Sequence, residues 1–545
     1  MTQRENEASV VEMERDSLGR VVRETVNGRS VQSAYDASGD RTEMTSSLGA
    51  RVVMSRDALG QPREMYFGAV DGFKEADVRF DRDGLGLESR RAFKNGIEVE
   101  WSRDVAGRPT ARRTFKRSLA AAAMGFAVGM LATPTFAQPQ REEVDARVYQ
   151  WRGEDQIAGI VDAASGPKFY DHDARGRLVR ERRPDAVVER AMDAVGNVYR
   201  SRTGSDRRYG PGGRLEMADG IRYEHDEDGN QTLKSGPDGD WHYRWNGHGM
   251  LREVERPDGV RVAFDYDPFA RRTAKRTLSA ASTVHQEVQF VWDGHNVIHE
   301  LDSDRGLISW QWEPESFTPI AKEHNGRRWT IASDHLGTPT EMYDEVGQLA
   351  WKMQLDVFGV PRFEAGRAED CPWRWPGQYE DGATGLFYNR WRYYAPISGE
   401  YTQRDPMGLD GGFRVHGYVE DPSNWLDPLG LKRCNIHRET IDALGPAPAG
   451  MVNPHLHHIV MEGAFSGWTR ANRRLVARSR RIIRDAGIDL QGVRNVMWAP
   501  NAGHSVEYAR AVHDALDAAE RRGGATSVAR ALASLRKRVA EGEWL

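Results

Sequence analysis

The sequence reads Arg15-Asp16-Ser17-Leu18-Gly19-Arg20 near its start, and copies of this motif recur through the first four hundred residues. Each copy has Asp, two variable residues, Gly, and then most often Arg, Asn or Gln. Neighbouring copies start 20 or 21 residues apart, as at Asp16, Asp36 and Asp57 and again at Asp173 and Asp193. Repetition at such a period indicates a repeat architecture. A further copy starts at Asp104, and degenerate copies start at Asp226, Asn246 and Asp344.

One copy of the motif predicts one β-hairpin. An Asp-x-x-Gly segment forms a tight turn because the carboxylate accepts nearby backbone N–H groups and Gly adopts a positive φ. The flanking residues alternate between apolar and charged, as in 177–181 and 260–266, which predicts strands. A hairpin of about twenty residues cannot bury its own apolar face, so the hairpins must stack. The sequence therefore predicts a mainly β repeat shell, made of a long antiparallel sheet that curls on itself.

The composition is consistent with this fold and excludes others. A chain of 545 residues exceeds one compact domain, and its 55 Gly, 16 Trp and 17 Tyr suit tight turns between aromatic strands. With 39% hydrophobic and 29% charged residues, it does not resemble a polytopic membrane protein. Cys371 and Cys434 cannot form a thiolate zinc site alone, so any metal site must use His and carboxylates.

Charge is distributed unevenly along the chain. Residues 432–545 contain 18 Lys and Arg against 11 Asp and Glu, a net charge of +7, whereas the whole chain carries −5 and residues 1–431 therefore −12. A basic tail beside an acidic body suggests that the tail meets a polyanion. Basic helices can also simply be solvated, and composition leaves both interpretations open.

An uncharged segment interrupts the repeat between Ser118 and Gln140. It contains the internal hydrophobic segment 118–137, whose apolar run is Leu119 to Ala132. Its basic flank and small-residue end are typical of a signal peptide, although more than a hundred residues precede it. Its apolar run is short for a transmembrane helix. We therefore expect a helix packed within the shell or against a partner, or membrane engagement during delivery, and no stable membrane span.

Two similar boxes lie near the end of the repeat region: Arg404-Asp405-Pro406-Met407-Gly408-Leu409 and Leu426-Asp427-Pro428-Leu429-Gly430-Leu431. If Asp405 and Asp427 face each other, they can share a proton as an aspartic protease pair does. One carboxylate would then activate water while the protonated neighbour polarises the peptide carbonyl. The alternative is two Asp-Pro turns without catalysis.

The pattern changes to a helical one beyond Leu431. Apolar residues at steps of three and four predict a helix from Trp468 to Ala486, and two further helices are expected near 505–520 and 526–539. The opposite face of the first helix is rich in guanidinium groups, which can bind a phosphate backbone or lie in solvent. Its candidate nucleic-acid-binding residues are Arg473, Arg474, Arg478 and Arg481.

Histidines mark a candidate catalytic site in the tail. His455, His457 and His458 lie within four residues, and His504 follows at the expected start of a helix. A strand or loop His pair and a helical His can converge on one divalent ion, while a remaining His deprotonates water. Such a site would suit phosphodiester cleavage.

The repeats resemble the YD repeats of the Rhs family of polymorphic toxins. The resemblance is sharpest at 376–381, at 385–390 and at Arg392-Tyr393-Tyr394-Ala395-Pro396. It implies a hollow β-cocoon that encloses a C-terminal toxin. The implied organisation is a repeat shell over 1–375, a core end with an autoproteolysis motif over 376–431, and a toxin domain over 432–545. Because family members carry more repeats and an N-terminal delivery domain, we expect a truncated or displaced chain.

The same resemblance gives the two boxes a role. In the family, the paired motif cuts the chain just after the second box. Carried over to this sequence, Asp405 and Asp427 are the catalytic pair, and the bond between Leu431 and Lys432 is cut. Cleavage would release residues 432–545.

The tail resembles the AHH family of HNH/endonuclease VII-type nucleases, which recurs as a C-terminal Rhs toxin. The matching features are the 457–460 core His-His-Ile-Val, with Leu456 in place of the family's Ala, and the 487–490 turn, Asn495, His504 and Tyr508. The resemblance implies a small α-rich ββα-metal domain that holds one divalent ion, Mg or Zn. His457 and His504 would be metal ligands, His458 the general base, and Asn495 the residue that orients the base.

These resemblances predict a self-cleaving effector in interbacterial competition, such as a type VI secretion effector, with a metal-dependent endonuclease as its toxin. Its substrate would be DNA or RNA, and its partners an immunity protein and a delivery apparatus or separate delivery module. It would be made in the producer's cytoplasm and act in the cytoplasm of the target cell. The alternatives are a surface or carbohydrate-binding scaffold with an inert tail, and a metal-free RNase toxin.

Overall fold

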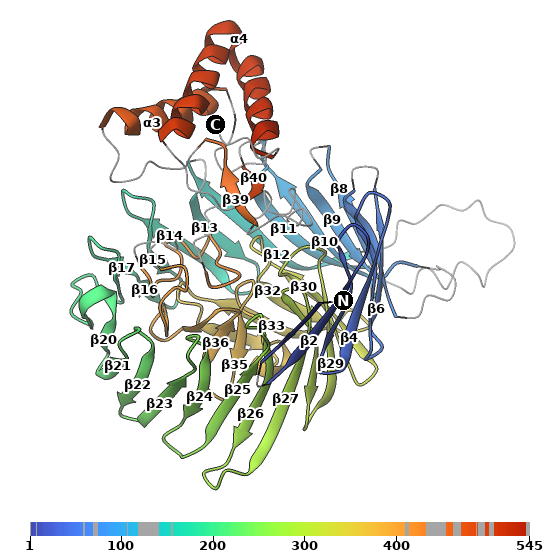
Figure 1. The fold of residues 1–545 in the computed structure, drawn as a ribbon, viewed down its shortest axis with the longest axis vertical. Helices are drawn as coiled ribbons and strands as arrows, with labels where there is room; N and C mark the ends of the chain where they lie inside the picture. The colour runs from blue at the N-terminus through green and yellow to red at the C-terminus, as the bar shows by residue number, and fades with distance from the viewer. Residues whose placement is uncertain are drawn as a thin grey trace, which may run out of the picture. The chain divides into compact units, whose positions relative to one another are not determined.

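The computed structural model describes residues 2–6, 8–57, 60–68, 75–84, 86–105, 107–117, 141–153, 156–408, 414–431, 454–460, 470–486, 488, 496–500 and 506–540. The chain forms two compact units, and the long first unit ends at Arg433. We call it the shell unit, and the unit that follows the tail unit. Within the described residues, the shell unit consists almost wholly of strands, whereas the tail unit contains two helices and a strand pair (Figure 1).

The Asp-x-x-Gly turns form as predicted. In the first, the Gly19 N–H donates to the Asp16 carbonyl (3.0 Å), and the Asp16 carboxylate accepts the N–H groups of Leu18 (2.9 Å) and Arg20 (3.0 Å). Gly19 has φ +82°, which glycine adopts without strain. The Arg20 side chain returns to the other carboxylate oxygen at 2.6 Å. The same turn recurs at Asp36, Asp173, Asp193, Asp334, Asp344, Asp356 and Asn246.

Consecutive strands pair antiparallel, each with the next along the chain. Within the described residues, the first sheet has sixteen strands: β1 (Thr2–Glu5), β2 (Val10–Arg15), β3 (Val21–Val26), β4 (Arg29–Tyr35), β5 (Arg41–Ser46), β6 (Arg51–Arg56), β7 (Pro62–Phe67), β8 (Val78–Arg82), β9 (Glu88–Phe93), β10 (Ile97–Arg103), β11 (Pro109–Arg117), β12 (Arg141–Arg152), β13 (Gln156–Asp162), β14 (Gly166–His172), β15 (Leu178–Arg182) and β16 (Val187–Glu189).

A second sheet repeats this arrangement after a short pair, β17 (Ala191–Met192) with β18 (Val198–Tyr199), and a 3₁₀ turn at Pro211–Gly213 lies between its first two strands. Its sixteen described strands are β19 (Arg207–Tyr209), β20 (Leu215–Ala218), β21 (Ile221–His225), β22 (Gln231–Gly236), β23 (Gly239–Trp245), β24 (Leu251–Glu255), β25 (Arg261–Tyr266), β26 (Arg272–Leu278), β27 (Val284–Asp293), β28 (Asn296–Asp302), β29 (Gly306–Trp312), β30 (Pro319–His324), β31 (Arg327–Ser333), β32 (Pro339–Tyr343), β33 (Leu349–Leu355) and β34 (Pro361–Ala365).

The predicted single long sheet is thus wrong in one respect, because the repeats form two sheets. The division falls near Arg190, whose buried guanidinium donates to the backbone carbonyls of Leu178 (3.1 Å), Val419 (2.7 Å) and Glu420 (2.6 Å). The Leu178 N–H also donates to the Glu420 carbonyl (3.2 Å). The distant segment 419–420 is therefore hydrogen-bonded to the first sheet near the point where that sheet ends.

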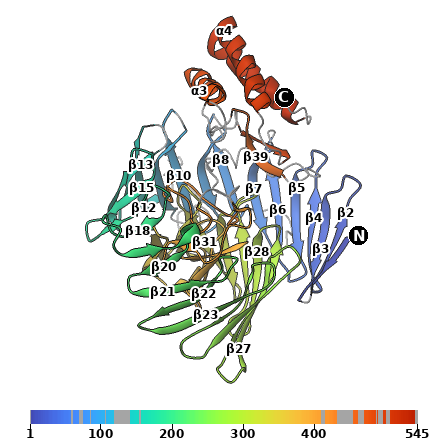
Figure 2. The same cartoon turned by 60° about the vertical axis from the view of Figure 1, so that its left-hand side comes forward.

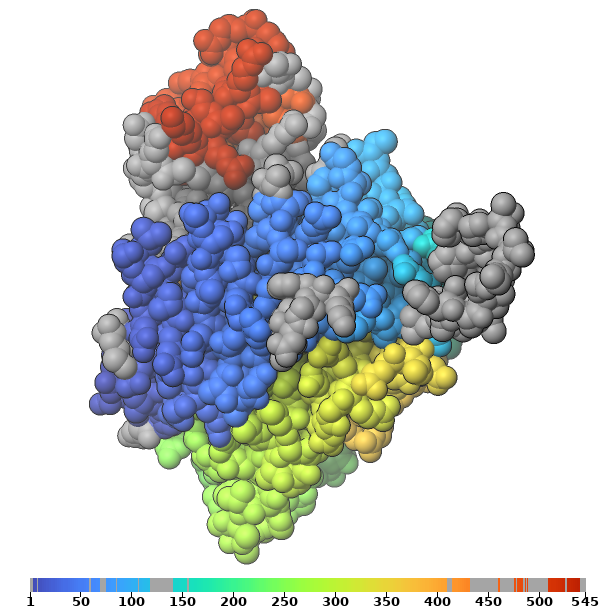
Figure 3. Space-filling model, turned by 90° about the vertical axis from the view of Figure 1, so that its right-hand side faces the viewer, coloured from blue at the N-terminus to red at the C-terminus, as the bar shows by residue number. Residues whose placement is uncertain are grey.

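The two sheets pack against each other within the shell unit. Val52, Phe80 and Val99 of the first sheet share one buried apolar cluster with Ile320 and Tyr343 of the second. Figure 2 draws the first sheet in blue to teal and the second in green to yellow. In Figure 3, residues of the first sheet (blue) and of the second (yellow-green) lie side by side on one face of the shell unit. Ion pairs such as Arg41–Asp293 (2.6 Å) and Arg328–Asp77 (2.8 Å) join the sheets.

The end of the repeat region forms a small sheet of its own. After a 3₁₀ turn at Ala368–Asp370, its four strands are β35 (Tyr379–Asp381), β36 (Leu386–Asn389), β37 (Arg392–Ala395) and β38 (Glu400–Tyr401). Tyr379, Tyr388 and Tyr393 join the buried cluster that includes Trp310 and Trp351 of the second sheet. The small sheet is therefore fixed to the wall of the shell unit, and residues 402–431 continue from it.

The tail unit combines β39 (Pro454–His458) and β40 (Val496–Pro500), which pair antiparallel, with α3 (Arg470–Asp485) and α4 (Val506–Ala540). Helical geometry breaks in α4 at Gly523 and Gly524, so α4 has two helical parts. The three helices predicted for this region are confirmed. Their apolar faces meet in a core that includes Ile482, Leu516 and Leu532. Within the described residues, each helix is too short or too polar to cross a membrane.

Candidate functional site

The two Asp-Pro boxes fold as variants of the repeat turn. In the first, the Gly408 N–H donates to the Asp405 carbonyl (2.8 Å) and the Met407 N–H to the Asp405 Oδ1 atom (2.8 Å). In the second, the Gly430 N–H donates to the Asp427 carbonyl (3.3 Å). Both aspartates are buried. The boxes therefore keep the hydrogen bonds of the repeat turn, but their carboxylates are buried.

The structure brings Asp405 and Asp427 together at one guanidinium group. Arg392 of β37 is buried, and its Nη2 atom lies 3.0 Å from Asp405 Oδ2 and 2.9 Å from Asp427 Oδ2. The two carboxylate oxygens are therefore within about 6 Å of each other. The positive charge between them offsets the repulsion that two buried carboxylates would otherwise exert.

The same arginine fixes the peptide that leads to the predicted scissile bond. Its Nε atom donates to the Gly430 carbonyl (2.5 Å) and its Nη1 atom to the Val415 carbonyl (3.1 Å). Asp427 Oδ1 accepts the N–H of Leu431 at 3.0 Å. The Asp427 carboxylate thus lies beside the main chain of the residue whose carbonyl is predicted to be attacked. Lys432, on the other side of that bond, lies outside the described residues.

Two glycines allow the second box to fit so closely. Gly430 has φ +65°, and a Cβ atom there would lie 2.5 Å from the Asn389 carbonyl oxygen. A Cβ atom on Gly377 would lie 1.9 Å from the Pro428 carbonyl oxygen. Any larger residue at either position would displace the segment that carries Asp427 and Leu431.

Sequence reasoning missed three side chains of this site. Arg392 lies in the Arg-Tyr-Tyr run already noted, but nothing in the sequence indicates that it meets both boxes. The Tyr401 hydroxyl donates to Asp427 Oδ2 (2.9 Å), and the Arg392 guanidinium stacks 3.6 Å above the Tyr401 ring. Asn389 donates to Tyr401 and to the Asp427 carbonyl. No signal in the sequence identifies them, because their contacts depend on how the small sheet packs against the second box.

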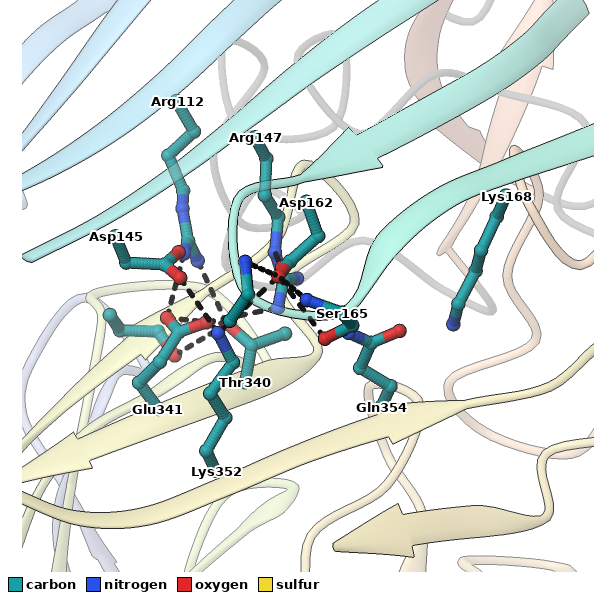
Figure 4. Close-up of polar contacts among 12 residues, drawn as sticks. Arg112, Asp145, Arg147, Asp162, Ser165, Lys168, Thr340, Glu341, Lys352 and Gln354 are labelled. Atoms are coloured by element: carbon teal, nitrogen blue, oxygen red, sulfur yellow. Dashed lines mark hydrogen bonds and ion pairs between the residues drawn. The ribbon is translucent and has the colours of Figure 1, made fainter. Parts of the chain in front are cut away.

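A second cluster of carboxylates lies between the two large sheets (Figure 4). Asp145 and Asp162 from the first sheet and Glu341 from the second are close enough to share a metal ion, and no other such trio occurs in the described residues. The cluster is already neutralised by three cations, in the pairs Arg112–Asp145 (2.5 Å), Arg112–Glu341 (2.7 Å), Arg147–Asp162 (2.8 Å), Arg147–Glu341 (2.9 Å) and Lys352–Asp145 (2.8 Å). It is therefore a structural link between the sheets.

The tail histidines are only partly described. His457 and His458 lie in β39, where His457 pairs with Met497 and His458 with Val496 of β40, but their side chains lie outside the described part. Asn495 and His504 also lie outside it. The Tyr508 hydroxyl donates to the Ile459 carbonyl (2.9 Å), which ties the first turn of α4 to the residue after His458.

The basic face of α3 is described in part. Arg478 and Arg481 are exposed, and Arg478 forms an ion pair with the buried Asp517 of α4, which also pairs with Arg521. Arg473 and Arg474 belong to α3, but their side chains lie outside the described part. The hydrophobic segment 118–137 lies outside the described residues as well.

Comparisons with known proteins agree with this architecture. Residues 146–415 match the Teneurin YD-shell family model. The Photorhabdus luminescens Tc holotoxin pore has a chain that aligns with a TM-score of 0.54 at 16% identity, over 80% of this chain and 24% of that one. At this identity the likeness shows the fold alone. The described shell unit therefore has a YD-shell fold.

Several curated toxins are similar in sequence. Probable deoxyribonuclease RhsB of Dickeya dadantii is 26% identical over 483 residues, which cover 82% of this chain and 32% of the relative. Double-stranded DNA deaminase toxin A of Burkholderia cenocepacia is 27% identical over 77% of this chain and 30% of that relative. Toxin protein Tse5 of Pseudomonas aeruginosa is 29% identical over 74% of this chain and 34% of that relative. The chain spans about a third of the length of these relatives.

Proposed function

We propose that this chain is the toxin-bearing part of an effector for competition between bacteria. Its shell unit cuts the Leu431–Lys432 bond, and residues 432–545 are then released as a metal-dependent nuclease. The observation that carries the proposal is the meeting of Asp405 and Asp427 at Arg392, with the Leu431 N–H held by Asp427.

The chemistry of the cut is that of an aspartic pair. One carboxylate takes a proton from water while the water oxygen adds to the Leu431 carbonyl carbon, and the protonated partner donates to the carbonyl oxygen. The Lys432 nitrogen then takes a proton as its bond to carbon breaks, which leaves a new carboxyl group and a new amine. Arg392 stabilises the charged carboxylate throughout and holds the Gly430 carbonyl in place.

Cell-free synthesis of the full chain tests the cut. We expect two fragments to appear with time from the unaltered chain, and only the full-length chain from Asp405→Asn and Asp427→Asn. Asp344→Asn is the matched control, because Asp344 forms the same turn in the repeat, far along the chain from the boxes. Cleavage of all four chains at equal rates would contradict the assignment.

For the tail, the proposed roles are those that the histidine pattern suggests: His457 and His504 as metal ligands, His458 as general base, and Asn495 to orient it. The proposed ion is Mg or Zn, and imidazole nitrogens are usual ligands of Zn. His457 lies on a strand, and the Tyr508–Ile459 bond holds the start of α4 near the end of that strand. When bound, the ion would offset charge on the phosphate. A relative named a probable deoxyribonuclease is the reason to test DNA first as substrate.

Expression of residues 432–545 tests the tail. We expect growth arrest and degraded plasmid DNA. His458→Ala should restore growth and leave the plasmid intact, and a chelator should stop the degradation of DNA by the tail. Activity that survives EDTA would instead favour a metal-free RNase, and a harmless tail that leaves DNA and RNA intact would favour an inert scaffold. Delivery into a target cell, an immunity protein in the producer and action in the target cytoplasm complete the proposal.

A further inference from the structure

A small cavity in the shell unit is lined by residues of the second sheet, the small sheet and the second box. Its volume is about 20 Å³. A cavity of this size has room for about one particle as large as a water molecule. The lining is mostly aromatic but also contains an arginine, and it includes Trp292, Trp312, Trp373, Tyr388, Arg390 and Pro428.

Arg390 occupies a backbone position that favours glycine. It is the first residue of the two-residue turn between β36 and β37, because Asn389 pairs with Arg392. Its φ is +56°. A positive φ at this place in a hairpin turn is usually met by Gly, Asn or Asp. A long side chain kept at a strained position indicates that the side chain itself has a role.

The guanidinium group of Arg390 is buried and only partly hydrogen-bonded. The residue is 5% exposed, and its Nη2 atom donates to the Phe269 carbonyl (2.8 Å). Within the described residues, its Nε and Nη1 atoms have no hydrogen-bond partner. Burial lowers the pKa of the Arg390 guanidinium below its usual value, but arginine stays protonated in proteins. The group is therefore a buried positive charge, which is costly unless a negative charge offsets it.

The carboxylates around Arg390 are paired with other cations. The ion pairs are Arg271–Asp267 (2.6 Å), Arg271–Glu24, Arg272–Asp381 (3.0 Å) and Lys275–Asp381 (3.2 Å). With Arg390 included, four cations share three carboxylates, so one positive charge is in excess. The ring faces of Trp391 (5.0 Å) and Trp292 (6.0 Å) offset only part of it.

Trp373 brings a second donor to the cavity. Its indole Nε1 atom is buried and has no acceptor among the described residues. We propose that a monatomic monovalent anion, chloride under ordinary conditions, binds in this cavity with Arg390 and Trp373 as its ligands. The Asn296 amide oxygen at the cavity also lacks a donor, which a water molecule would supply. Water alone, however, would leave the charge of Arg390 without compensation.

The anion stabilises the second box. Pro428 lines the cavity, and the N–H of Trp391 donates to the Leu429 carbonyl (3.2 Å). An anion that holds Arg390 therefore also holds the turn on which this part of the box rests. The inference goes beyond the proposed self-cleavage and does not require it.

Chloride-35 NMR on the purified full chain tests for the site, because an ion that binds a protein gives a broader signal. We expect broadening that bromide reverses and that gluconate, which is too large for the cavity, does not. Arg390→Met should lose this broadening. Arg390→Gly should lose it too, while relieving the strain at φ +56°. The matched control is Arg252→Met, which removes one exposed positive charge from β24.

Thermal unfolding gives a second measurement on the same proteins. For a Kd of about 10 mM, replacing gluconate by chloride from about 5 to 200 mM should raise the unfolding midpoint of the shell unit by about 1 to 2 °C. The shift should persist in Arg252→Met and disappear in both Arg390 variants.

Equal broadening of the chloride signal by all four proteins would overturn the inference and mean that the cavity holds water alone. A midpoint that chloride raises equally in all four would overturn it as well, because the effect would then be a general one of salt. Both results are independent of whether the chain cuts itself.

Discussion

Gly430 has no room for a side chain, and this makes it a sensitive residue for the proposed cut. In Gly430→Ala the new Cβ atom would clash with the Asn389 carbonyl oxygen. The alanine would also have to adopt the φ of +65° that glycine has at this position. We expect cleavage at least about 10-fold slower, because the displaced Leu431 loses its place beside Asp427.

Gly385→Ala is the control for this change. Gly385 has a similar φ of +70°, but nothing lies within 4 Å of a Cβ atom built there. It should cost about 1 kcal/mol of stability through backbone strain alone and leave the cut unaffected. Fragment yields from the two chains are compared on denaturing gels, and equal yields would show that the close fit at Gly430 is unimportant.

At the residue scale, the sequence indicates that Asp405 and Asp427 form a pair, but it does not indicate which side chains surround them. Two Asp-Pro boxes 22 residues apart make it plausible that Asp405 and Asp427 meet, and the structure brings both to Arg392. The contributions of Arg392, Tyr401 and Asn389 could not be predicted, because their contacts depend on how the small sheet packs and have no local signature.

At the scale of elements, the basic helix α3 offers a test of nucleic-acid binding. Asp517 of α4 neutralises part of its charge by pairing with Arg478. We expect Asp517→Asn, made in an inactive His458→Ala tail, to bind DNA more tightly and to steepen the salt dependence of binding by about one phosphate contact.

Asp514→Asn is the matched control, because Asp514 is exposed on the same helix and contacts His513. It removes one negative charge without releasing Arg478. Binding is measured by fluorescence anisotropy at several salt concentrations. Equal salt slopes for the two variants would show that Arg478 does not contact the phosphate backbone.

The ion cluster between the sheets gives a prediction about pH. Burial would raise the pKa of Asp162, but the charges of Arg147 and Lys352 outweigh it and hold this pKa well below its usual range. Because the folded pKa is the lower one, the stabilisation is present above about pH 4 and is lost as the pH falls below that.

Asp162→Asn should therefore lower the free energy of unfolding of the shell unit by about 3 kcal/mol at pH 7, the cost of breaking a buried ion pair. The difference from the unaltered protein should shrink steadily toward pH 3. Denaturant melts at pH 7, 5, 4 and 3 measure it. A difference independent of pH would mean that the charge of Asp162 is not what stabilises the sheets.

Elements were predictable from the sequence where the pattern is local. The Asp-x-x-Gly turns, strands such as β25 and the helices of the tail follow from residues within one turn or hairpin. The division into two sheets was not predictable, and at that point Arg190 contacts residues 419–420, more than two hundred positions away. The pairing of Arg112 with Glu341 is equally remote in sequence.

For the whole molecule, the proposed function joins a YD-shell unit to a separate tail unit at one bond. Relatives named for DNA hydrolysis and for DNA deamination are similar to this chain at nearly equal identity. Similarity at this level therefore does not select the chemistry of the tail, which must be established from residues 432–545 themselves.

The intact mass of the purified protein tests the central claim most directly. After denaturation, mass spectrometry should find two chains, one ending at Leu431 and one beginning at Lys432, whose masses sum to that of the 61.4 kDa chain plus one water. Asp427→Asn should give the single full-length mass. A single uncut chain from the unaltered sequence, or a cut at any other bond, would contradict the account.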